Sequence, residues 1–154
     1  MNHTLAARSE MIVTAESCTG GLISAALTDV PGSSEAVFGG FVAYHNRAKI
    51  EMIGVPAELI EKHGAVSEPV VRAMAEGALK TAGVAIAIAV TGVAGPGGGT
   101  EDKPVGLVHF GCATKAGTSV HERRFGDLGR QGIREATVGV ALDIVLECLG
   151  VQSP

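Results

Sequence analysis

The chain alternates between short apolar runs and longer segments in which apolar and polar residues are mixed. The apolar runs have the length of β-strands and are rich in β-branched residues, and Gly, Pro or Asp lies near most of their ends. This pattern predicts five strands, at residues 11–14, 37–44, 84–92, 105–114 and 119–125.

The segments between these runs carry apolar residues at helical spacing. Strands that alternate with such segments indicate a layered α/β fold. Residues 84–90 are apolar at consecutive positions, which predicts a central strand covered on both faces. Only about four residues separate the last two strands, so they could form an antiparallel hairpin, and the sheet is expected to be mixed. The predicted helices cover residues 21–29, 49–53, 57–62, 68–82 and 129–149.

Composition narrows the class of protein. A length of 154 residues, without a low-complexity linker, predicts one domain over residues 1–154. Only 3% of the residues are aromatic, which argues against a stacking platform for single-stranded nucleic acid. The net charge of −4 argues against a nucleic-acid or membrane partner, since both need a basic face. The three cysteines lack a zinc-binding spacing and no charged-then-apolar leader is visible, so a cytoplasmic protein is expected.

Three predicted strand ends carry polar or glycine-rich sequence. They are ESCTGG (16–21), YHNRAK (44–49) and TGVAGPGGGTEDKP (91–104). Ligands of α/β sheets collect at the carboxyl ends of strands, so these segments should meet in one crevice. Glycines let main-chain N–H groups approach an anion, and the start of the helix near Gly20 adds a positive dipole end. We therefore expect a phosphate or a developing oxyanion to bind there, although neither common nucleotide-binding glycine motif is present.

The sequence resembles one known family, the C-terminal domain of the competence/damage-inducible protein CinA and its stand-alone form, the nicotinamide-nucleotide amidohydrolases. The resemblance implies a three-layer α/β/α sandwich with a mixed, mostly parallel sheet of about five strands. It also implies deamidation of nicotinamide mononucleotide to nicotinate mononucleotide and ammonia, with no metal and no cofactor. The matching stretches are residues 14–34, 39–55, 63–79, 89–110 and 129–136, with ESCTGG and GVAGPGGGTEDKPVG the most specific.

The resemblance bears on the ends of the domain too. The larger relatives carry an additional N-terminal domain that resembles molybdopterin-binding proteins, and this chain is expected to be the stand-alone form. Relatives usually have a longer helix before the first strand, so residues 1–9 are expected to form a frayed or partial helix.

The residues fit amide hydrolysis. A carboxamide is a poor electrophile, so its hydrolysis needs an activated nucleophile, a base and donors for the oxyanion. Ser17 supplies a hydroxyl at a strand-to-helix turn, and Lys49 would act as the base if burial lowers its pKa. Tyr44 would relay the proton or orient Lys49. The same three residues match the catalytic Ser, Tyr and Lys of the family. The N–H groups of Thr19, Gly20 and Gly21 are the candidate oxyanion hole.

The remaining candidates would bind the nucleotide. The resemblance suggests Thr91 and Arg130 as substrate contacts. Arg130 and Arg134 share a helix face, so one of them would neutralise the substrate phosphate, and we choose Arg130. The glycine-rich loop is expected to close over the nucleotide. The other candidates are Asn46 in the YHN motif, Ser33 and Ser34, whose hydroxyls would either cap the next segment or reach a phosphate, and Gly92 and Gly95.

Each candidate has an alternative reading. Ser17 would serve equally as a helix N-cap, and Lys49 as a solvated surface charge. Cys18 is a rival nucleophile, since a thiolate at a helix N-terminus is reactive, but we expect it to pack inward. Glu16 would either order the turn or bind substrate. The histidines form no metal-binding pattern, so no metal site is expected.

The alternative function is a non-enzymatic nucleotide-binding or regulatory module. The combination of Ser17, Tyr44 and Lys49 argues against it, because a binding module needs no activated hydroxyl. A phosphatase or metal hydrolase should carry clustered Asp and His, whereas the acids here are scattered. The expected partners are the small nucleotide substrate and further copies of the chain in a homo-oligomer.

Overall fold

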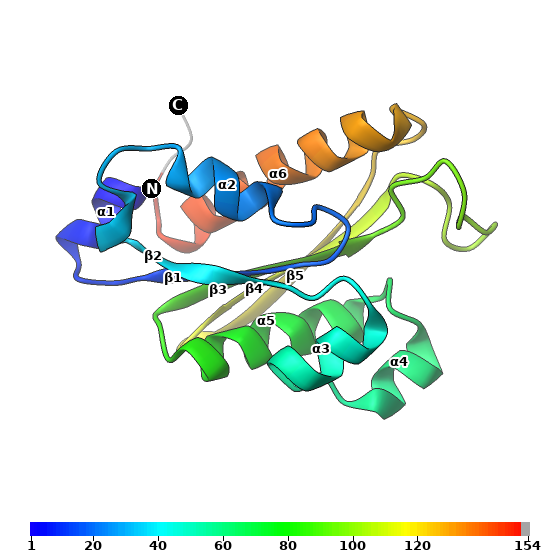
Figure 1. The fold of residues 1–154 in the computed structure, drawn as a ribbon, viewed down its shortest axis with the longest axis horizontal. Helices are drawn as coiled ribbons and strands as arrows, with labels where there is room; N and C mark the ends of the chain where they lie inside the picture. The colour runs from blue at the N-terminus through cyan, green and yellow to red at the C-terminus, as the bar shows by residue number, and fades with distance from the viewer. Residues whose placement is uncertain (152–154) are drawn as a thin grey trace.

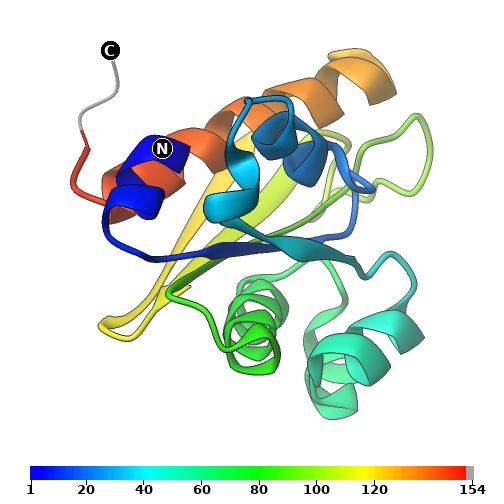
Figure 2. The same cartoon turned by 60° about the vertical axis from the view of Figure 1, so that its left-hand side comes forward.

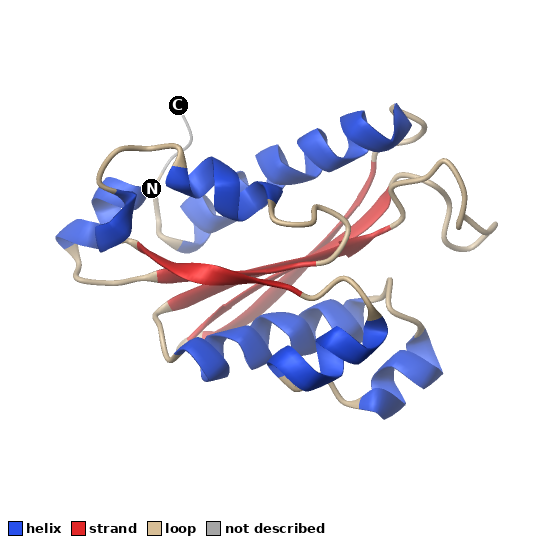
Figure 3. Ribbon diagram, viewed as in Figure 1, coloured by secondary structure: helices blue, strands red, loops and turns tan. Residues whose placement is uncertain are grey.

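The computed structural model describes residues 1–151 and places one five-stranded sheet between two layers of helices (Figure 1, Figure 3). The strand order is β2-β1-β3-β4-β5. β1 pairs in parallel with β2 and β3, whereas β3–β4 and β4–β5 are antiparallel. The strands are β1 (Ile12–Glu16), β2 (Val37–Val42), β3 (Ile86–Gly92), β4 (Leu107–Thr114) and β5 (Gly117–Arg124).

The prediction of five strands in a mixed sheet is confirmed, but "mostly parallel" is too loose. Only the strands joined through helices, β1 to β2 and β2 to β3, can return in the same direction. The loop 93–106 contains no helix, so β4 runs back beside β3, and a short turn then returns β5 beside β4. Half of the sheet is therefore antiparallel.

Three helices cover each face of the sheet, which confirms the three-layer sandwich (Figure 2). One layer holds α1 (Asn2–Ala7), α2 (Leu22–Thr28) and α6 (Gly129–Cys148). The other holds α3 (Asn46–Ile53), α4 (Ala57–His63) and α5 (Glu68–Ala82), and a short 3-10 turn η1 (Ser33–Glu35) precedes β2. Among residues 1–151, no helix combines the length and hydropathy needed to cross a membrane.

Helix α3 begins three residues before its predicted start. The Nδ1 of His45 accepts a hydrogen bond from the N–H of Arg47 at 3.1 Å and so caps the first turn. Histidine is not among the common N-cap residues, so the YHN segment gave no start signal. The earlier start places Lys49 in the middle of a regular helix, with a fixed direction.

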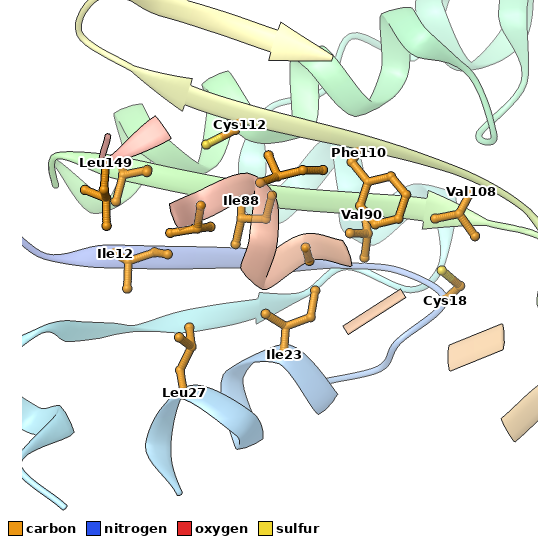
Figure 4. Close-up of a cluster of buried hydrophobic side chains, with 14 of the residues drawn as sticks. Ile12, Cys18, Ile23, Leu27, Ile88, Val90, Val108, Phe110, Cys112 and Leu149 are labelled. Carbon is orange, nitrogen blue, oxygen red and sulfur yellow. The ribbon is translucent and has the colours of Figure 1, made fainter. Parts of the chain in front are cut away.

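The core on the α2/α6 side is built from branched aliphatic side chains (Figure 4). Ile86, Ile88 and Val90 of β3 lie beneath these helices, and every residue from 86 to 91 is buried. The prediction of a central strand covered on both faces is thus confirmed. Each fully buried Ile or Val contributes about 1.5–3 kcal/mol to the free energy of folding relative to an exposed one, so this layer stabilises the packing of α6 on the sheet.

The face toward α5 is made of small residues instead. Ala87 and Ala89 of β3 and Ala113 of β4 lie under α5, and Gly111 leaves no space for a side chain because an added Cβ would lie 2.9 Å from the carbonyl oxygen of Val71. A helix packs unusually close to such a surface. Aromatic side chains at these positions would not fit between the sheet and α5.

Gly77 of α5 is in contact with the end of α3, since an added Cβ would lie 1.8 Å from the backbone oxygen of Ile53. We expect Gly77→Ala to lower the free energy of unfolding by about 2 kcal/mol through overpacking, despite the better helix propensity of Ala. The matched control is Gly139 of α6, where an added Cβ meets nothing within 4 Å and Ala should stabilise by about 0.5–1 kcal/mol. Urea unfolding of both variants measures the difference, and equal stabilities would contradict this packing.

Candidate functional site

The three polar strand ends meet in one cavity, as predicted. It lies beyond the carboxyl ends of β1, β2 and β3 and has a volume of about 210 Å³. A larger depression of about 590 Å³ lies at the opposite end of the sheet, beside the start of β3 and the end of α6. The smaller cavity is the candidate site because it brings a serine and a buried lysine together. Its walls are formed by Ser17, Cys18, Tyr44, Asn46, Lys49, Ala65, Val66, Thr91, Gly92, Ala94 and Arg130.

Ser17 and Lys49 are in direct contact at the bottom of this cavity. The Nζ of Lys49 lies 3.0 Å from the Oγ of Ser17 and 2.8 Å from the main-chain oxygen of Tyr44. The backbone of Ser17 is fixed in turn, because its N–H donates to the oxygen of Val90 at 3.1 Å and so continues the pairing of β1 with β3. The hydroxyl of Ser17 and the amine of Lys49 are thus held on separate but rigid elements.

Lys49 is only 1% exposed, and burial lowers its pKa from the ordinary value. Removing an ammonium group from water disfavours its charged form unless an anion compensates. The ion pairs found in residues 1–151 lie on the exposed surface, and none includes Lys49. A neutral Lys49 amine has a lone pair to accept the proton of Ser17 and two N–H groups, one of which donates to Tyr44.

Glu16 lies beside this pair but faces away from the cavity. Its carboxylate is fully buried and accepts five hydrogen bonds. Two come from the hydroxyls of Thr14 and Thr19, at 3.2 and 2.6 Å. Three come from the N–H groups at the start of α2, those of Gly21, Ile23 and Ser24, at 2.8–3.1 Å. Of the two roles left open for Glu16, the structure shows the ordering of the turn.

Glu16 occupies part of the site where we expected an anion to bind. We predicted that an oxyanion or phosphate would bind the N–H groups of Thr19, Gly20 and Gly21 at the start of α2. The Gly21 N–H donates to Glu16 instead, the Gly20 N–H donates to the oxygen of Ser17 at 3.1 Å, and Thr19 is buried outside the cavity lining. For Gly20 and Gly21 the prediction was wrong, because a carbonyl oxygen and the buried carboxylate of the chain itself take the positions of the anion. The role of the Thr19 N–H stays a prediction.

Cys18 packs inward, as expected. It is 5% exposed and belongs to the core beneath α6 (Figure 4). Burial raises the pKa of its thiol to about 11, so it is protonated at neutral pH. A buried neutral thiol is a poor nucleophile, which favours Ser17 over Cys18.

Tyr44 contacts the pair through its main chain. Its phenol is exposed, and the hydroxyl accepts a hydrogen bond from Nη2 of Arg130 at 3.1 Å. Of the two roles expected for Tyr44, to relay the proton or to orient Lys49, the structure shows an orienting contact, made by the Tyr44 carbonyl. The phenol and Arg130 form the outer rim of the cavity, since Nη1 of Arg130 also donates to the oxygen of Gly95 at 2.8 Å.

Arg134, one turn along α6 from Arg130, makes different contacts. Its Nε and Nη2 donate to the main-chain oxygens of Cys18 and Thr19, both at 3.1 Å. Arg134 thus ties the turn after Ser17 to α6, whereas Arg130 faces the cavity. The preference for Arg130 over Arg134 as the residue that faces the ligand agrees with this geometry.

The other predicted residues divide into two groups. Asn46, Thr91 and Gly92 line the cavity, and the hydroxyl of Thr91 donates to the oxygen of Ala65 at 3.0 Å. Ser33 and Ser34 lie in η1, which precedes β2, so they are at the amino ends of the parallel strands and away from the cavity. They were wrong candidates because a hydroxyl near the site in sequence can lie at the other end of a strand.

The loop between α4 and α5 supplies a wall that sequence reasoning missed. Ala65 and Val66 line the cavity, although neither carries a polar side chain. Their inclusion in the matching stretch 63–79 was the only available signal. Across residues 1–151, no group of three or more His, Cys, Asp and Glu side chains is arranged to hold a metal ion.

The fold and the cavity define a three-layer α/β/α protein with a serine–lysine pair at the carboxyl ends of its parallel strands. The sequence profile of the CinA C-terminal domain matches residues 1–149. The chain belongs to this family.

Similar proteins agree with this assignment. A CinA-like protein of Parasynechococcus marenigrum is 54% identical over 140 residues, which cover 90% of this chain and 33% of that protein. Another, of Mycolicibacterium vanbaalenii, is 53% identical over 145 residues, or 94% of this chain and 34% of that protein. The chain thus spans about a third of the length of these relatives.

Solved structures share the whole fold. The competence/damage inducible protein CihA of Agrobacterium tumefaciens superposes with a TM-score of 0.94 at 48% identity, covering 97% of this chain and 90% of the other. A CinA superfamily protein of Klebsiella pneumoniae superposes with a TM-score of 0.91 at 35% identity, covering 96% and 92% of the two chains.

We expect Glu16→Gln to destabilise the domain by about 3 kcal/mol or more. The amide group of Gln would turn an N–H toward donors that now bind a carboxylate oxygen, and hydrogen bonds to a buried charge are worth about 1.5–3 kcal/mol each. Thermal unfolding monitored by circular dichroism measures the loss. Glu61→Gln on the exposed surface of α4 is the control and should melt like the wild type. An unchanged melting temperature for Glu16→Gln would contradict the role of the carboxylate.

Proposed function

We propose that this domain hydrolyses a carboxamide, with nicotinamide mononucleotide as the substrate and nicotinate mononucleotide and ammonia as the products. The observation that carries the proposal is the 3.0 Å contact between Ser17 Oγ and the Nζ of a buried Lys49 without a carboxylate partner. A lysine of this kind has a lowered pKa and suits a general base. The choice of substrate rests on the family resemblance.

The acylation step follows from this contact. The neutral Lys49 amine takes the proton of Ser17 as Oγ attacks the carbonyl carbon, and the carbonyl oxygen becomes an oxyanion. We place that oxyanion near the amide of Cys18, which follows the nucleophile and lines the cavity. The Lys49 ammonium then gives its proton to the departing amino group, ammonia leaves and an ester on Ser17 remains.

Deacylation repeats the same chemistry with water. Lys49, neutral again, removes a proton from the water that attacks the ester carbon. The tetrahedral intermediate collapses to a carboxylic acid as Lys49 returns the proton to Oγ of Ser17, and the acid then loses its own proton to the released ammonia. The sum is one amide and one water converted to one carboxylate and one ammonium ion, which needs no metal and no redox partner.

The cavity suits a ring-sized amide better than a whole nucleotide. Its 210 Å³ would hold the nicotinamide ring between the nucleophile turn and the loop at Ala65. The ribose and phosphate would extend to the rim, where Arg130 is exposed and its guanidinium already binds two oxygen acceptors, Gly95 and Tyr44. A phosphate in that position would pair with Arg130.

Purified protein incubated with nicotinamide mononucleotide should release ammonia and nicotinate mononucleotide. Ser17→Ala should reduce kcat by at least about 10³-fold while the nucleotide still binds, because only the covalent step is lost. Ser33→Ala, a serine at the opposite end of the sheet, is the matched control and should keep full activity. Binding without hydrolysis by the wild type would favour the alternative of a non-enzymatic nucleotide-binding module.

The pH dependence tests the role of Lys49. The base must be neutral, so kcat/KM should rise with pH through an ionisation below the ordinary value of 10.5 and level off above it. Lys49→Arg keeps the positive charge but cannot deprotonate, so it should lose about 10²–10⁴-fold in rate. If Lys49→Arg retained most of the activity, Lys49 would be an anchor for the substrate and not the base.

Lys49→Met separates catalysis from stability. Because burial lowers the pKa of Lys49 in the folded state, the unfolded chain binds more protons, and this residue costs stability at every pH below the ordinary lysine value. Met has similar volume without the charge. We expect Lys49→Met to be inactive yet to unfold at a higher urea concentration than the wild type at pH 7, and an inactive, destabilised variant would contradict this account.

A further inference from the structure

Two cysteines that are distant in sequence meet at the end of the molecule opposite Ser17. Cys112 lies in β4 directly across from Ser119 of β5, and Cys148 is the last residue of α6. The Sγ of Cys148 lies 4.0 Å from the Oγ of Ser119. All three residues line one depression of about 360 Å³, so the sulfur of Cys148 faces the cross-strand pair that contains Cys112.

The two thiols have unequal surroundings. Cys112 is 1% exposed, whereas Cys148 is exposed to solvent. The neighbouring Cys112 thiol and Ser119 hydroxyl lower the pKa of Cys148 to about 7, against the opposing effects of burial and of Glu147. The nearness of Cys148, together with burial, raises the pKa of Cys112, which therefore keeps its proton.

His121 extends this group of polar side chains. Its Nε2 lies 3.3 Å from the Oγ of Ser119. The Ser119 oxygen can accept a hydrogen bond from His121 while its own proton points to Cys148. Cys148 is thus an exposed sulfur that shares one depression with a hydroxyl and a second thiol.

We propose that Cys148 and Cys112 form a peroxide-reactive dithiol, in which Cys148 is the attacking sulfur and Cys112 the resolving one. The thiolate of Cys148 attacks one oxygen of a hydroperoxide, the O–O bond breaks, and the leaving oxygen takes a proton to give water or an alcohol. Cys148 becomes a sulfenic acid. Cys112 then attacks that sulfur, its proton and the hydroxyl leave as water, and a disulfide joins β4 to the end of α6.

The balance of the two steps is simple. Two thiols and one peroxide give one disulfide and two waters when the oxidant is hydrogen peroxide, and a dithiol reductant reverses the change. The two cysteines line the same depression, and the Cys148 sulfur lies 4.0 Å from the hydroxyl of Ser119, the residue that pairs across from Cys112. This inference is independent of amide hydrolysis, since none of its residues lines the Ser17 cavity.

The third cysteine is an internal control. Cys18 is buried and its thiol is protonated at neutral pH, so it should not react. Reduced protein is treated with one equivalent of hydrogen peroxide, the remaining thiols are alkylated, and peptides are identified by mass spectrometry. We expect a single linked pair, Cys112 with Cys148, an alkylated Cys18, and full return of free thiols after treatment with dithiothreitol.

Single variants assign the two roles. Cys148→Ser, at an exposed position, should slow peroxide consumption at least tenfold. Cys112→Ala should leave a sulfenic acid on Cys148 that dimedone traps. Cys18→Ala should consume peroxide at the rate of the wild type. The proposal is overturned if wild-type Cys148 forms sulfinic acid or an intermolecular disulfide in place of the internal link, or if all three thiols remain free. The wild-type result is decisive by itself should Cys112→Ala fail to fold.

Discussion

The buried carboxylate of Glu16 connects the end of β1 to the start of α2. A charge in this position would be very unfavourable alone, but five donors surround it, and three of them are the N–H groups that a helix otherwise leaves unpaired. The turn between strand and helix is therefore rigid at its inner side. Ser17, the next residue, takes its position from this arrangement, and Arg134 of α6 closes the turn from the opposite side.

Lys49, which faces Ser17, is buried with far fewer hydrogen-bond partners than Glu16. Glu16 accepts five hydrogen bonds, whereas Lys49 has two acceptors and, within residues 1–151, no carboxylate in an ion pair with it. One buried ionisable group is thus fully hydrogen-bonded, whereas burial lowers the pKa of the other. Functional sites commonly keep such an imbalance at some cost in stability, which the rest of the α/β/α sandwich has to offset.

Much of the fold could be predicted because the strands are apolar runs bounded by turn residues. The apolar run of residues 84–90 predicted the central strand. The three polar strand ends predicted the cavity, since parallel strands bring their carboxyl ends together. Predictions failed where a side chain had two possible partners. Nothing in ESCTGG says that the carboxylate of Glu16 takes the N–H groups first, or that Tyr44 would use its carbonyl and not its phenol to contact Lys49. The proximity of Cys112 and Cys148 at one depression was equally hidden, because it brings a strand together with a helix end 36 positions later.

The chain begins at the end of the sheet opposite the cavity, and α6 ends there too (Figure 1). Arg8, just after α1, donates to the oxygen of Leu149 at 3.1 Å, so the two regions are tied together. An affinity handle, a surface anchor or a second protein fused in front of α1 would therefore be kept away from the rim formed by Tyr44 and Arg130. The domain can be immobilised through that end with its cavity facing the solution.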